Sequence, residues 1–538
     1  MSRLLPKALA VAAAAAIAVA IPVAAQATPP SSGTTVTQVA APATSDTTRA
    51  CSVPLTPGGP VCYALVRNDL KPVHADAIKP NATPSGYSPS SLLSAYNLAS
   101  AAANNGGGQT VAVIENADDP NLESDLGTYR AQYGLPACTT ANGCFEKVNQ
   151  SGQQGNYPGG DTGWGTEASL DIDMVSAICP KCHIIVVEAG DLDAAQNTAV
   201  SLGAHYISNS WGTGDNSGNA GADGDYNHSG VVDVASTGDG GYGVSFPATS
   251  RYVVAAGGTS LRTASNSRGW SETAWSGSGA GCSSWESKPS WQTDSGCSRR
   301  TDADVSAVAD PNTGVAVYDS YGEGGWFVVG GTSASSPIIA SVYALAGTPV
   351  DGAASLYSHT GNLNDVTSGS DGSCSTSYLC NAGNGYDGPT GLGTPNGLAA
   401  FGGTTGGGGG GTATGAVTSG ISGKCLDDYA ASNADGTKVD LYSCNGTGAQ
   451  QWTAESNGTL QTNGKCLDIT GGSTSDGALI ELWDCNGGGN QVWQAQNGEL
   501  VNPASGKCLD DPGFSTTDGT QLDLWDCNGG ANQKWAIP

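Results

Sequence analysis

Basic side chains are scarce in this sequence. Its 538 residues hold 20 Lys and Arg against 48 Asp and Glu, a formal net charge of −28 at pH 7, and the cations form no cluster. Nucleic acids and anionic membranes attract clustered positive charge, so we expect neither as a partner. An acidic surface also fits work at low pH, where carboxylates become neutral.

The apolar run at the N-terminus is short for a membrane anchor. Arg3 and Lys7 precede an Ala/Val/Ile-rich stretch that reaches Pro22, and Ala25-Gln26-Ala27 follows as a small-residue cleavage motif. Its apolar core has roughly 15 residues, whereas a spanning helix needs about 20. Residues 1–27 are therefore predicted to be a signal peptide. We expect a secreted, extracellular protein with no membrane span after cleavage.

The 16 cysteines agree with export, because disulfides persist in oxidising compartments. Cys179-Pro-Lys-Cys182 could indicate zinc or redox chemistry. A single Cys-x-x-Cys motif without a second pair of ligands is, however, more typical of a structural pair. The spacing leaves the connectivity open. Close sequential pairs in the first part of the chain are Cys51 and Cys62, Cys138 and Cys144, Cys179 and Cys182, Cys282 and Cys297, and Cys374 and Cys380.

The length favours two to four domains. Residues 28–85 are rich in Ser, Thr, Pro and Ala and are predicted to be a short leader or propeptide-like segment. Beyond them, β-branched runs alternate with helix-period segments, which predicts an α/β domain with a mainly parallel sheet and a site at the carboxyl ends of its strands. Predicted strands are 110–114, 183–187, 231–234, 252–255 and 314–318, and predicted helices are 90–103, 166–178, 192–203 and 337–346.

A Gly-rich linker at residues 403–415 separates this domain from a repeat at 416–538. Cys425, Cys466 and Cys508 each open a Cys-Leu-Asp motif, and each unit contains a second cysteine and closes on Gln-x-Trp. Three such units suit a threefold all-β body better than an open solenoid, which would need capping repeats.

The strongest catalytic signal is Gly-Gly-Thr-Ser-Ala-Ser-Ser-Pro at residues 330–337, followed by an apolar helical stretch. We expect Pro337 in a first helical turn, which places Ser333 at a helix N-terminus. There the backbone donors and the helix dipole favour a developing oxyanion. The alternative is an ordinary N-cap serine in a Gly/Ser-rich turn.

A serine nucleophile needs a base, which is usually histidine. None of the five histidines stands in the His-Gly-Thr-His setting that a subtilisin would carry. His183 opens an apolar strand and His205 precedes another, so both favour structural roles. The full set is His74, His183, His205, His228 and His359.

Carboxylates are the other candidates for the base. A helical wheel over residues 166–178 puts Glu167 and Asp171 on the apolar side, away from Asp173. Two carboxyls in a partly dry place titrate as a pair, which suits a base and its orienter. Asp239 follows a predicted strand in Gly-Asp-Gly. Acids at i and i+4 are common, however, and Gly-Asp-Gly is also an ordinary turn.

Together these motifs resemble, in order and setting, those of the sedolisin, or serine-carboxyl, peptidases, whose fold is subtilisin-like. The resemblance covers residues 86–402 and is specific because several separated motifs agree. Further matching runs are 87–96, 109–114, Ser208-Asn-Ser-Trp-Gly212 and 304–311.

The resemblance implies a serine-type endopeptidase, with tripeptidyl-peptidase activity as another possibility. It assigns Ser333 as nucleophile, Glu167 as base, Asp171 as its orienter and Asp239 as oxyanion donor from a protonated carboxyl. Reference carboxyl pKa values near 4, against about 6.5 for histidine, place this chemistry at acid pH unless burial raises them.

The family also binds one calcium ion. The resemblance implies carboxylates of Asp365 and Asp387, with backbone oxygens of Val366, Gly383 and Gly385, as its ligands, and calcium takes such hard oxygen donors.

Two departures stand out. The family usually carries a large folded prodomain, whereas here residues 28–85 alone separate signal peptide and domain. Its oxyanion turn usually reads Gly-Asp-Ser-Gly, but Gly240 takes the place of the serine.

The tail resembles ricin-type β-trefoil lectin repeats, in which an Asp, an aromatic residue and an Asn-Gln pair form each sugar pocket. The first repeat has Asp427, Tyr442 and Gln450, but Ala449 replaces the Asn, so we rank it last. The Gln and Trp of Gln-x-Trp can also be core residues. The better pockets are Asp468, Trp483, Asn490 and Gln491 in the second repeat, and Asp510, Trp525, Asn532 and Gln533 in the third.

Protein or peptide substrates and a glycan or polysaccharide are thus the expected partners. One competing hypothesis is an inactive peptidase fold that serves as a glycan-binding adhesin. Another is a glycosidase that uses the acid pair, which would leave Ser333 without a role.

Overall fold

We analysed a computed structural model of the chain that describes residues 46–52, 58–73, 84–347, 352–402, 413–455, 458–496 and 498–537. The predicted signal peptide and residues 403–412 of the predicted linker lie outside these ranges. Within them, no helix is long and apolar enough to span a membrane.

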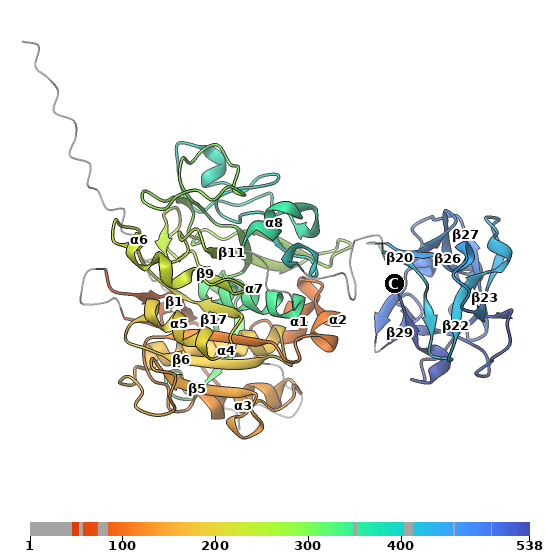
Figure 1. Cartoon of the computed structure of the whole chain (residues 1–538), viewed down its shortest axis with the longest axis horizontal. Coiled ribbons are helices and arrows are strands. Elements are labelled where there is room, and N and C mark those ends of the chain that lie inside the picture. Colours follow the sequence, from red (N-terminus) through yellow and green to blue (C-terminus); the bar gives the residue numbers. More distant parts are fainter. Residues whose placement is uncertain are drawn as a thin grey trace, which may run out of the picture. The chain divides into compact units, whose positions relative to one another are not determined.

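An eight-stranded sheet forms the centre of the N-terminal part (Figure 1). All its strand pairs are parallel except the one between β11 and β12 at one edge. The sheet has the order β12 (Trp270–Ala274), β11 (Val253–Thr263), β9 (Val232–Ser236), β7 (Tyr206–Asn209), β4 (Thr110–Glu115), β6 (His183–Glu188) and β5 (Phe145–Asn149), with β15 (Val305–Val308) also paired to β11.

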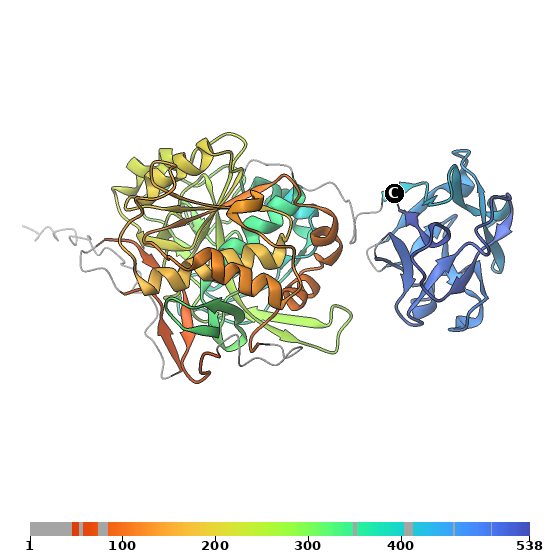
Figure 2. The same cartoon turned by 90° about the horizontal axis from the view of Figure 1, so that it is seen from below.

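Helices cover both faces of this sheet, as Figure 2 shows. Alternate residues of the central strands enter different cores: in β4, Val111 and Val113 face one core and Ala112 and Ile114 the other. The first core is completed by α1 (Pro89–Ala95), α2 (Ala99–Asn104), α3 (Leu122–Gln132), α4 (Thr162–Ile178), α7 (Thr332–Ala346) and α8 (Ala354–Ser358), and the second by α5 (Leu192–Ser201) and α6 (Asn219–Ala222). The predicted subtilisin-like α/β class is confirmed.

The predicted strand 314–318 forms β16 (Val315–Asp319), but it lies outside the central sheet. It belongs to an antiparallel sheet of order β1 (Thr47–Arg49), β3 (Leu65–Arg67), β17 (Gly325–Gly330), β16. A second small sheet joins β2 (Val61–Cys62) to β8 (Trp211–Gly214) and β10 (Ser245–Phe246). The sequence predicts a separate leader for residues 28–85, yet its described strands pair with strands of the peptidase-like domain.

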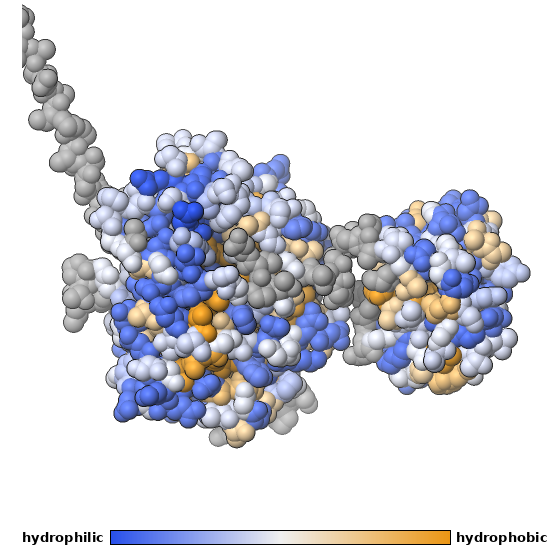
Figure 3. Space-filling model, in the orientation of Figure 1, coloured by the Kyte–Doolittle hydropathy of each residue, from blue (hydrophilic) through white to orange (hydrophobic). Residues whose placement is uncertain are grey.

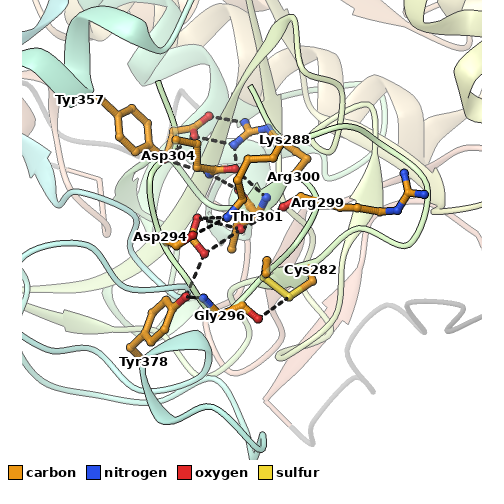
Figure 4. A network of polar contacts seen from close by, with 12 residues as sticks. Cys282, Lys288, Asp294, Gly296, Arg299, Arg300, Thr301, Asp304, Tyr357 and Tyr378 are labelled. Carbon is orange, nitrogen blue, oxygen red and sulfur yellow. Dashed lines mark hydrogen bonds and ion pairs between the residues drawn. A yellow bond between two sulfur atoms is a disulfide. The ribbon is translucent and has the colours of Figure 1, made fainter. Parts of the chain in front are cut away.

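A polar network fastens the long connection between β12 and β15 to the rest of the domain (Figure 4). Arg300 and Asp304 form a fully buried bidentate ion pair at 2.7 and 2.5 Å. Tyr357 donates to Asp304 at 2.9 Å, and Asp304 also accepts the backbone N–H of Ala255 in β11 at 2.8 Å. Because a buried charge is costly without a partner, these bonds hold the connection against the central sheet. Two short strands lie nearby, β13 (Gly281–Cys282) and β14 (Thr301–Asp302).

Residues 413–536 form one all-β body of fourteen strands. Trp452, Trp493 and Trp535 lie in a shared core, and each indole N–H donates to a backbone oxygen at 3.0 to 3.1 Å, as expected for core residues. The strands are β20 (Ala413–Gly415), β21 (Thr418–Ser419), β22 (Lys424–Asp428), β23 (Thr437–Ser443), β24 (Trp452–Ala454), β25 (Leu460–Thr462), β26 (Lys465–Ile469), β27 (Ala478–Trp483), β28 (Gln494–Gln496), β29 (Glu499–Asn502), β30 (Lys507–Asp510), β31 (Thr520–Gln521), β32 (Asp523–Trp525) and β33 (Trp535–Ala536).

All 16 cysteines form disulfides between sequential neighbours, so the expected pairs are confirmed. Cys179 and Cys182 are bonded to each other, as expected for a structural pair, and a disulfide leaves no thiolate to bind zinc. In the β-trefoil, each repeat contains one disulfide that closes 19 residues.

Carboxyl groups are numerous both inside and outside the protein. Figure 3 shows hydrophilic residues over most of the described surface on one face. Inside, burial raises the pKa of Asp119 to about 7 and the pKa values of Glu188 and Asp371 to about 8. Asp233 in β9 is fully buried without a hydrogen-bond partner for either oxygen, and burial raises its pKa well above the ordinary range.

These groups predict a fold that is more stable in acid. Their pKa values lie above the unfolded value near 4, so the folded state binds protons more tightly. Their stabilisation is complete below about pH 4 and is lost as pH rises toward 7 or 8. We expect the thermal unfolding midpoint to fall by roughly 5 °C or more over that range. Calorimetry of a Ser333→Ala variant, which excludes self-digestion, measures it.

Asp233→Asn is the matched variant, because it replaces one of these titrating carboxyls with an amide of the same shape that does not titrate. Its midpoint should depend less on pH than that of the parent. A midpoint that rises between acid and neutral pH would contradict this explanation.

Candidate active site

Ser333 is the second residue of α7, which begins at Thr332 after Gly331. Pro337 lies inside the helix and not in its first turn, so that part of the prediction is wrong. Because proline has no N–H, the carbonyl of Ser333 loses its helical partner, and the Ser210 hydroxyl donates to it instead at 3.2 Å. The Ser333 hydroxyl in turn donates to the backbone oxygen of Ser210 at 3.0 Å.

Glu167 and Asp171 lie one turn apart on α4, which packs against α7 (Figure 1). Both side chains are fully buried. Burial raises the pKa of Glu167 well above its ordinary value, and the neighbouring Asp171 raises it further. Neither Glu167 oxygen has a hydrogen bond of normal length, although the Ser333 hydroxyl is close enough to lower that pKa somewhat.

Asp171 is held by the same serine that supports the nucleophile. The Ser210 hydroxyl donates to its Oδ1 at 2.7 Å. Burial raises the pKa of Asp171, and hydrogen bonds from Ser210 and Ser208 oppose the rise. Ser210 therefore connects the Ser333 backbone to the carboxyl pair.

Asp239 follows β9 and points at the first turn of α7. Its Oδ1 accepts the backbone N–H and the hydroxyl of Thr332 at 2.8 and 2.9 Å. Its Oδ2 is buried without a partner. Burial raises the pKa of Asp239 to about 7 against the opposing effect of Thr332. Below that pH, Oδ2 can carry a proton and donate it in a hydrogen bond.

The four predicted catalytic residues are thus brought together from α4, α7 and the turn after β9. The four described histidines lie elsewhere: His183, His205 and His359 are exposed, and His228 pairs with Asn197 at 3.0 Å. His74 is outside the described residues. The available acids and bases at Ser333 are therefore carboxyls.

Glu115 is a site residue that sequence reasoning missed. It is the last residue of β4, fully buried, and neither of its oxygens has a partner. Burial raises its pKa, and the charges of Asp171 and Glu167 raise it further, which places it in the same carboxyl cluster. Its position at the carboxyl end of a central strand was the available signal.

The predicted calcium ligands also lie together. Asp365 accepts the N–H of Gly385 at 2.9 Å, and Asp387 accepts the N–H of Gly383 at 2.9 Å, so both carboxylates contact one Gly-rich loop. Burial raises the pKa of Asp387 to about 7, and the charge of Asp365 contributes to the rise. Two converging carboxylates in an oxygen-rich loop fit the donor chemistry of calcium.

The two better sugar pockets share one arrangement. Asp468 accepts from Asn490 and Gln491 at 2.8 and 2.7 Å, and Trp483 beside them is 41% exposed. In the third repeat, Asp510 accepts from Asn532 and Gln533 at 2.7 Å, and Trp525 is 46% exposed.

Each arrangement leaves a polar cluster beside an open aromatic face. A hollow of about 320 Å³ lies at the third repeat, lined by Asp510, Asn532 and Trp525, and by Asn528, which the sequence did not indicate. Gln491 and Gln533 are fully buried, so they position the aspartates. In the first repeat Ala449 leaves Asp427 with Gln450 alone, at 2.9 Å.

A Ser-Glu-Asp cluster on a parallel α/β fold, with Asp239 bonded to the first turn of the serine's helix, is the arrangement expected of serine peptidases that use carboxylates in place of histidine. Comparison with known proteins agrees. Kumamolisin from Bacillus sp. (strain MN-32) is 30% identical over 367 residues, 60% of this chain and 64% of that protein. Sedolisin from Pseudomonas sp. (strain 101) is 39% identical over 174 residues, 28% of this chain and 29% of that protein.

The chain therefore spans less than two thirds of the length of these relatives. A solved structure of Pseudomonas sedolisin, 27% identical, aligns with 59% of this chain and 96% of its own, with a TM-score of 0.49. Residues 413–535 match the model of the ricin-type beta-trefoil lectin domain. The agglutinin from Abrus precatorius, 26% identical, aligns with 23% of this chain and 47% of its own, with a TM-score of 0.22.

The N-terminal part of this chain is a homologue of the sedolisin, or serine-carboxyl, peptidases. Its C-terminal part is a ricin-type β-trefoil domain.

Proposed function

We propose that this protein is a secreted endopeptidase that hydrolyses peptide bonds at acid pH through Ser333, Glu167, Asp171 and Asp239. The observation that carries the proposal is the burial of Glu167 and Asp171 beside Ser333, with a third buried carboxyl, Asp239, bonded to the first turn of the same helix as Ser333. No described histidine is placed to serve as base.

In the proposed reaction Ser333 turns its hydroxyl from the Ser210 oxygen to Glu167, which takes the proton as Oγ attacks the carbonyl carbon. Asp171 holds Glu167 in place and shares the proton of the pair. Asp239 donates from protonated Oδ2 to the oxyanion. Glu167 then returns its proton to the leaving amine, and water hydrolyses the acyl-enzyme.

This mechanism needs two protonation states at once. Glu167 must be able to accept a proton, whereas Asp239 must carry one. Because burial raises the pKa of Asp239 to about 7, the donor is lost as pH rises through neutrality. The alkaline limit of activity should therefore lie near pH 7, and the acid limit reflects protonation of the carboxyl pair.

Substitution of Ser333 and Asp239 tests this mechanism on casein. Ser333→Ala should lower activity by about three orders of magnitude or more. Asp239→Ala should cost about 10²- to 10³-fold. Asp239→Asn keeps a donor at every pH, so its pH profile, relative to its own maximum, should extend further above neutrality.

Equal activity of wild type and Ser333→Ala would overturn the serine mechanism. No activity in either protein would favour the glycan-binding adhesin.

The β-trefoil domain is proposed to bind glycans and so to bring the peptidase to glycosylated or polysaccharide-rich substrates. Trp525 offers a face for the apolar side of a sugar, and Asp510 with Asn532 offers hydrogen bonds to its hydroxyls. Trp483 and Asp468 repeat this arrangement.

Glycan arrays can test these pockets. We expect Trp525→Ala to weaken binding by roughly tenfold or more, since stacking and area burial are lost together. Tyr442→Ala in the first repeat is the matched control and should change binding little. If Tyr442→Ala abolished binding and Trp525→Ala did not, our ranking of the repeats would be reversed.

Calcium is proposed to bind Asp365 and Asp387 together with the backbone oxygens of Val366, Gly383 and Gly385. When bound, the ion would neutralise two converging carboxylates and fasten the loop, so its role is structural.

Removal of calcium with a chelator near neutral pH should lower the thermal unfolding midpoint by a few degrees. Asp387→Asn should abolish that response, whereas Asp484→Asn in the β-trefoil should leave it unchanged. A chelator effect of equal size in Asp387→Asn would place the ion elsewhere.

A further inference from the structure

A segment of the chain itself crosses the proposed peptidase site. On one side of the site, β2 pairs antiparallel with β8, which matches Val61 with Gly212 and Cys62 with Trp211. On the other side, β3 pairs with β17, which matches Leu65 with Gly330. Between the two pairings, Tyr63 is 3% and Ala64 is 1% exposed. Peptides that bind to sheet edges are held in this way, by backbone pairing on both flanks.

The backbone around Tyr63 meets each proposed catalytic group. Its N–H donates to Ser333 Oγ at 3.1 Å and to the Ser210 oxygen at 3.2 Å. A Cβ on Gly331 would lie 1.7 Å from the Tyr63 carbonyl oxygen and 2.7 Å from Asp239 Oδ2, so these two oxygens are at most 4.4 Å apart. The N–H of Ala64 lies against the Glu167 carboxyl.

We propose that Tyr63–Ala64 is the first peptide bond that this peptidase cleaves, and that the cut opens the site to other substrates. This inference rests on the proposed peptidase function. It identifies residues 61–64 as a bound substrate and not as a permanent strand of the domain.

The contacts distinguish this bond from its neighbours. Three contacts surround the Tyr63 carbonyl. Ser333 Oγ accepts the N–H of Tyr63, and Asp239 Oδ2 lies near the Tyr63 carbonyl oxygen. The Glu167 carboxyl lies against the N–H of Ala64, the nitrogen that would leave. Cleavage of Cys62–Tyr63 or Ala64–Leu65 would require the segment to shift by a residue, and would break the registers with β8 and β17.

The reaction balances within the groups present and one water molecule. Ser333 Oγ bonds to the Tyr63 carbonyl carbon, and the carbon–nitrogen bond to Ala64 breaks. Glu167 takes the Ser333 proton and passes it to the Ala64 nitrogen, which leaves as a free amine. Water then splits the ester, restores Ser333 and leaves a Tyr63 carboxylate.

The Tyr63 side chain also marks a specificity pocket. A Cβ on Gly212 would overlap the Tyr63 hydroxyl and lie 2.8 Å from Ser245 Oγ, so glycine at 212 makes room for a phenol ring. The Ser245 side chain hydrogen-bonds the Tyr63 hydroxyl, and burial raises the pKa of that hydroxyl. The mature enzyme should therefore prefer tyrosine or phenylalanine before the scissile bond.

The disulfides permit release after the cut. Cys51 and Cys62 are bonded to each other and both precede Tyr63, and their sulfur atoms lie within 4.8 Å of a Glu167 carboxylate oxygen. The other seven disulfides lie beyond residue 64. Cleavage therefore leaves no covalent bond between the linked Cys51 and Cys62, which lie against Glu167, and the domain. The antiparallel pairing of Thr47 with Arg67 remains as a non-covalent contact.

Mass spectrometry and N-terminal sequencing of the full chain test the proposal. Wild type and Ser333→Ala are incubated at about pH 4, near the carboxyl reference pKa. We expect a new N-terminus at Ala64 in wild type only, and casein hydrolysis that rises with a lag as the cut proceeds. The mature enzyme should then cleave peptides with tyrosine before the bond at least about tenfold faster than matched aspartate peptides.

Tyr63→Asp should slow the appearance of the Ala64 terminus by about tenfold or more, because the pocket would have to bury a charge. Tyr429→Asp, at an exposed tyrosine of the β-trefoil, is the matched control and should process like wild type. Tyr63→Phe keeps the ring and should restore processing, which separates pocket occupancy from a folding defect.

The outcomes separate the two hypotheses. Casein hydrolysis by a chain that stays intact at Tyr63–Ala64, or is cut elsewhere, would refute this inference and leave the peptidase function standing. An intact chain without casein hydrolysis would overturn both.

Discussion

The carboxyl pair of Glu167 and Asp171 is the constraint on which the rest of the site depends. Both groups lie on α4 with no exposed surface, so water cannot stabilise their charges and a proton becomes favourable there. Glu115 adds a third carboxyl to the same dry volume. A base built in this way works in acid, whereas histidine would be protonated. The acid preference of the stability and the acid preference of the proposed chemistry thus have one cause, the burial of carboxyls.

Ser210 and Pro337 show how the fold supports that pair. Pro337 removes one helical hydrogen bond, and the single hydrogen of the Ser210 hydroxyl is shared between the Ser333 carbonyl at 3.2 Å and Asp171 Oδ1 at 2.7 Å. One side chain on the turn after β7 therefore lies between α7, which carries Ser333, and α4, which carries Asp171. Asp239 arrives from the adjacent strand β9 and is fastened to Thr332 beside Ser333. Ser210, Asp239 and Glu115 lie at the carboxyl ends of the parallel strands β7, β9 and β4. The helix α7 brings Ser333 to the same place, although it follows β17 of the small antiparallel sheet.

The segment from Val61 to Arg67 occupies the proposed site in this structure. Strand pairing with β8 and β17 places a tyrosine in the pocket beside Gly212 and a peptide bond among the catalytic groups.

The sequence by itself determined the elements and the residue types of the site. Short β-branched runs identified β4 and β6, which are buried on both faces, and period-3.6 patterns identified α4 and α5. The wheel position of Glu167 and Asp171 and the turn at Asp239 indicated the site, and the Cys-Leu-Asp repeats indicated the β-trefoil. These are local signals, since each depends on residues close together in the chain.

Only the tertiary structure decided which elements and side chains contact one another. It placed β16 outside the central sheet, Pro337 inside α7 and Glu115 beside Asp171, and it brought Tyr63 to Ser333 across 270 residues of sequence. Strand pairing and side-chain burial of this kind arise from contacts between distant segments. The pattern of residues 28–85 shows a loose, polar leader, because nothing within that stretch records the strands β8 and β17 that bind it.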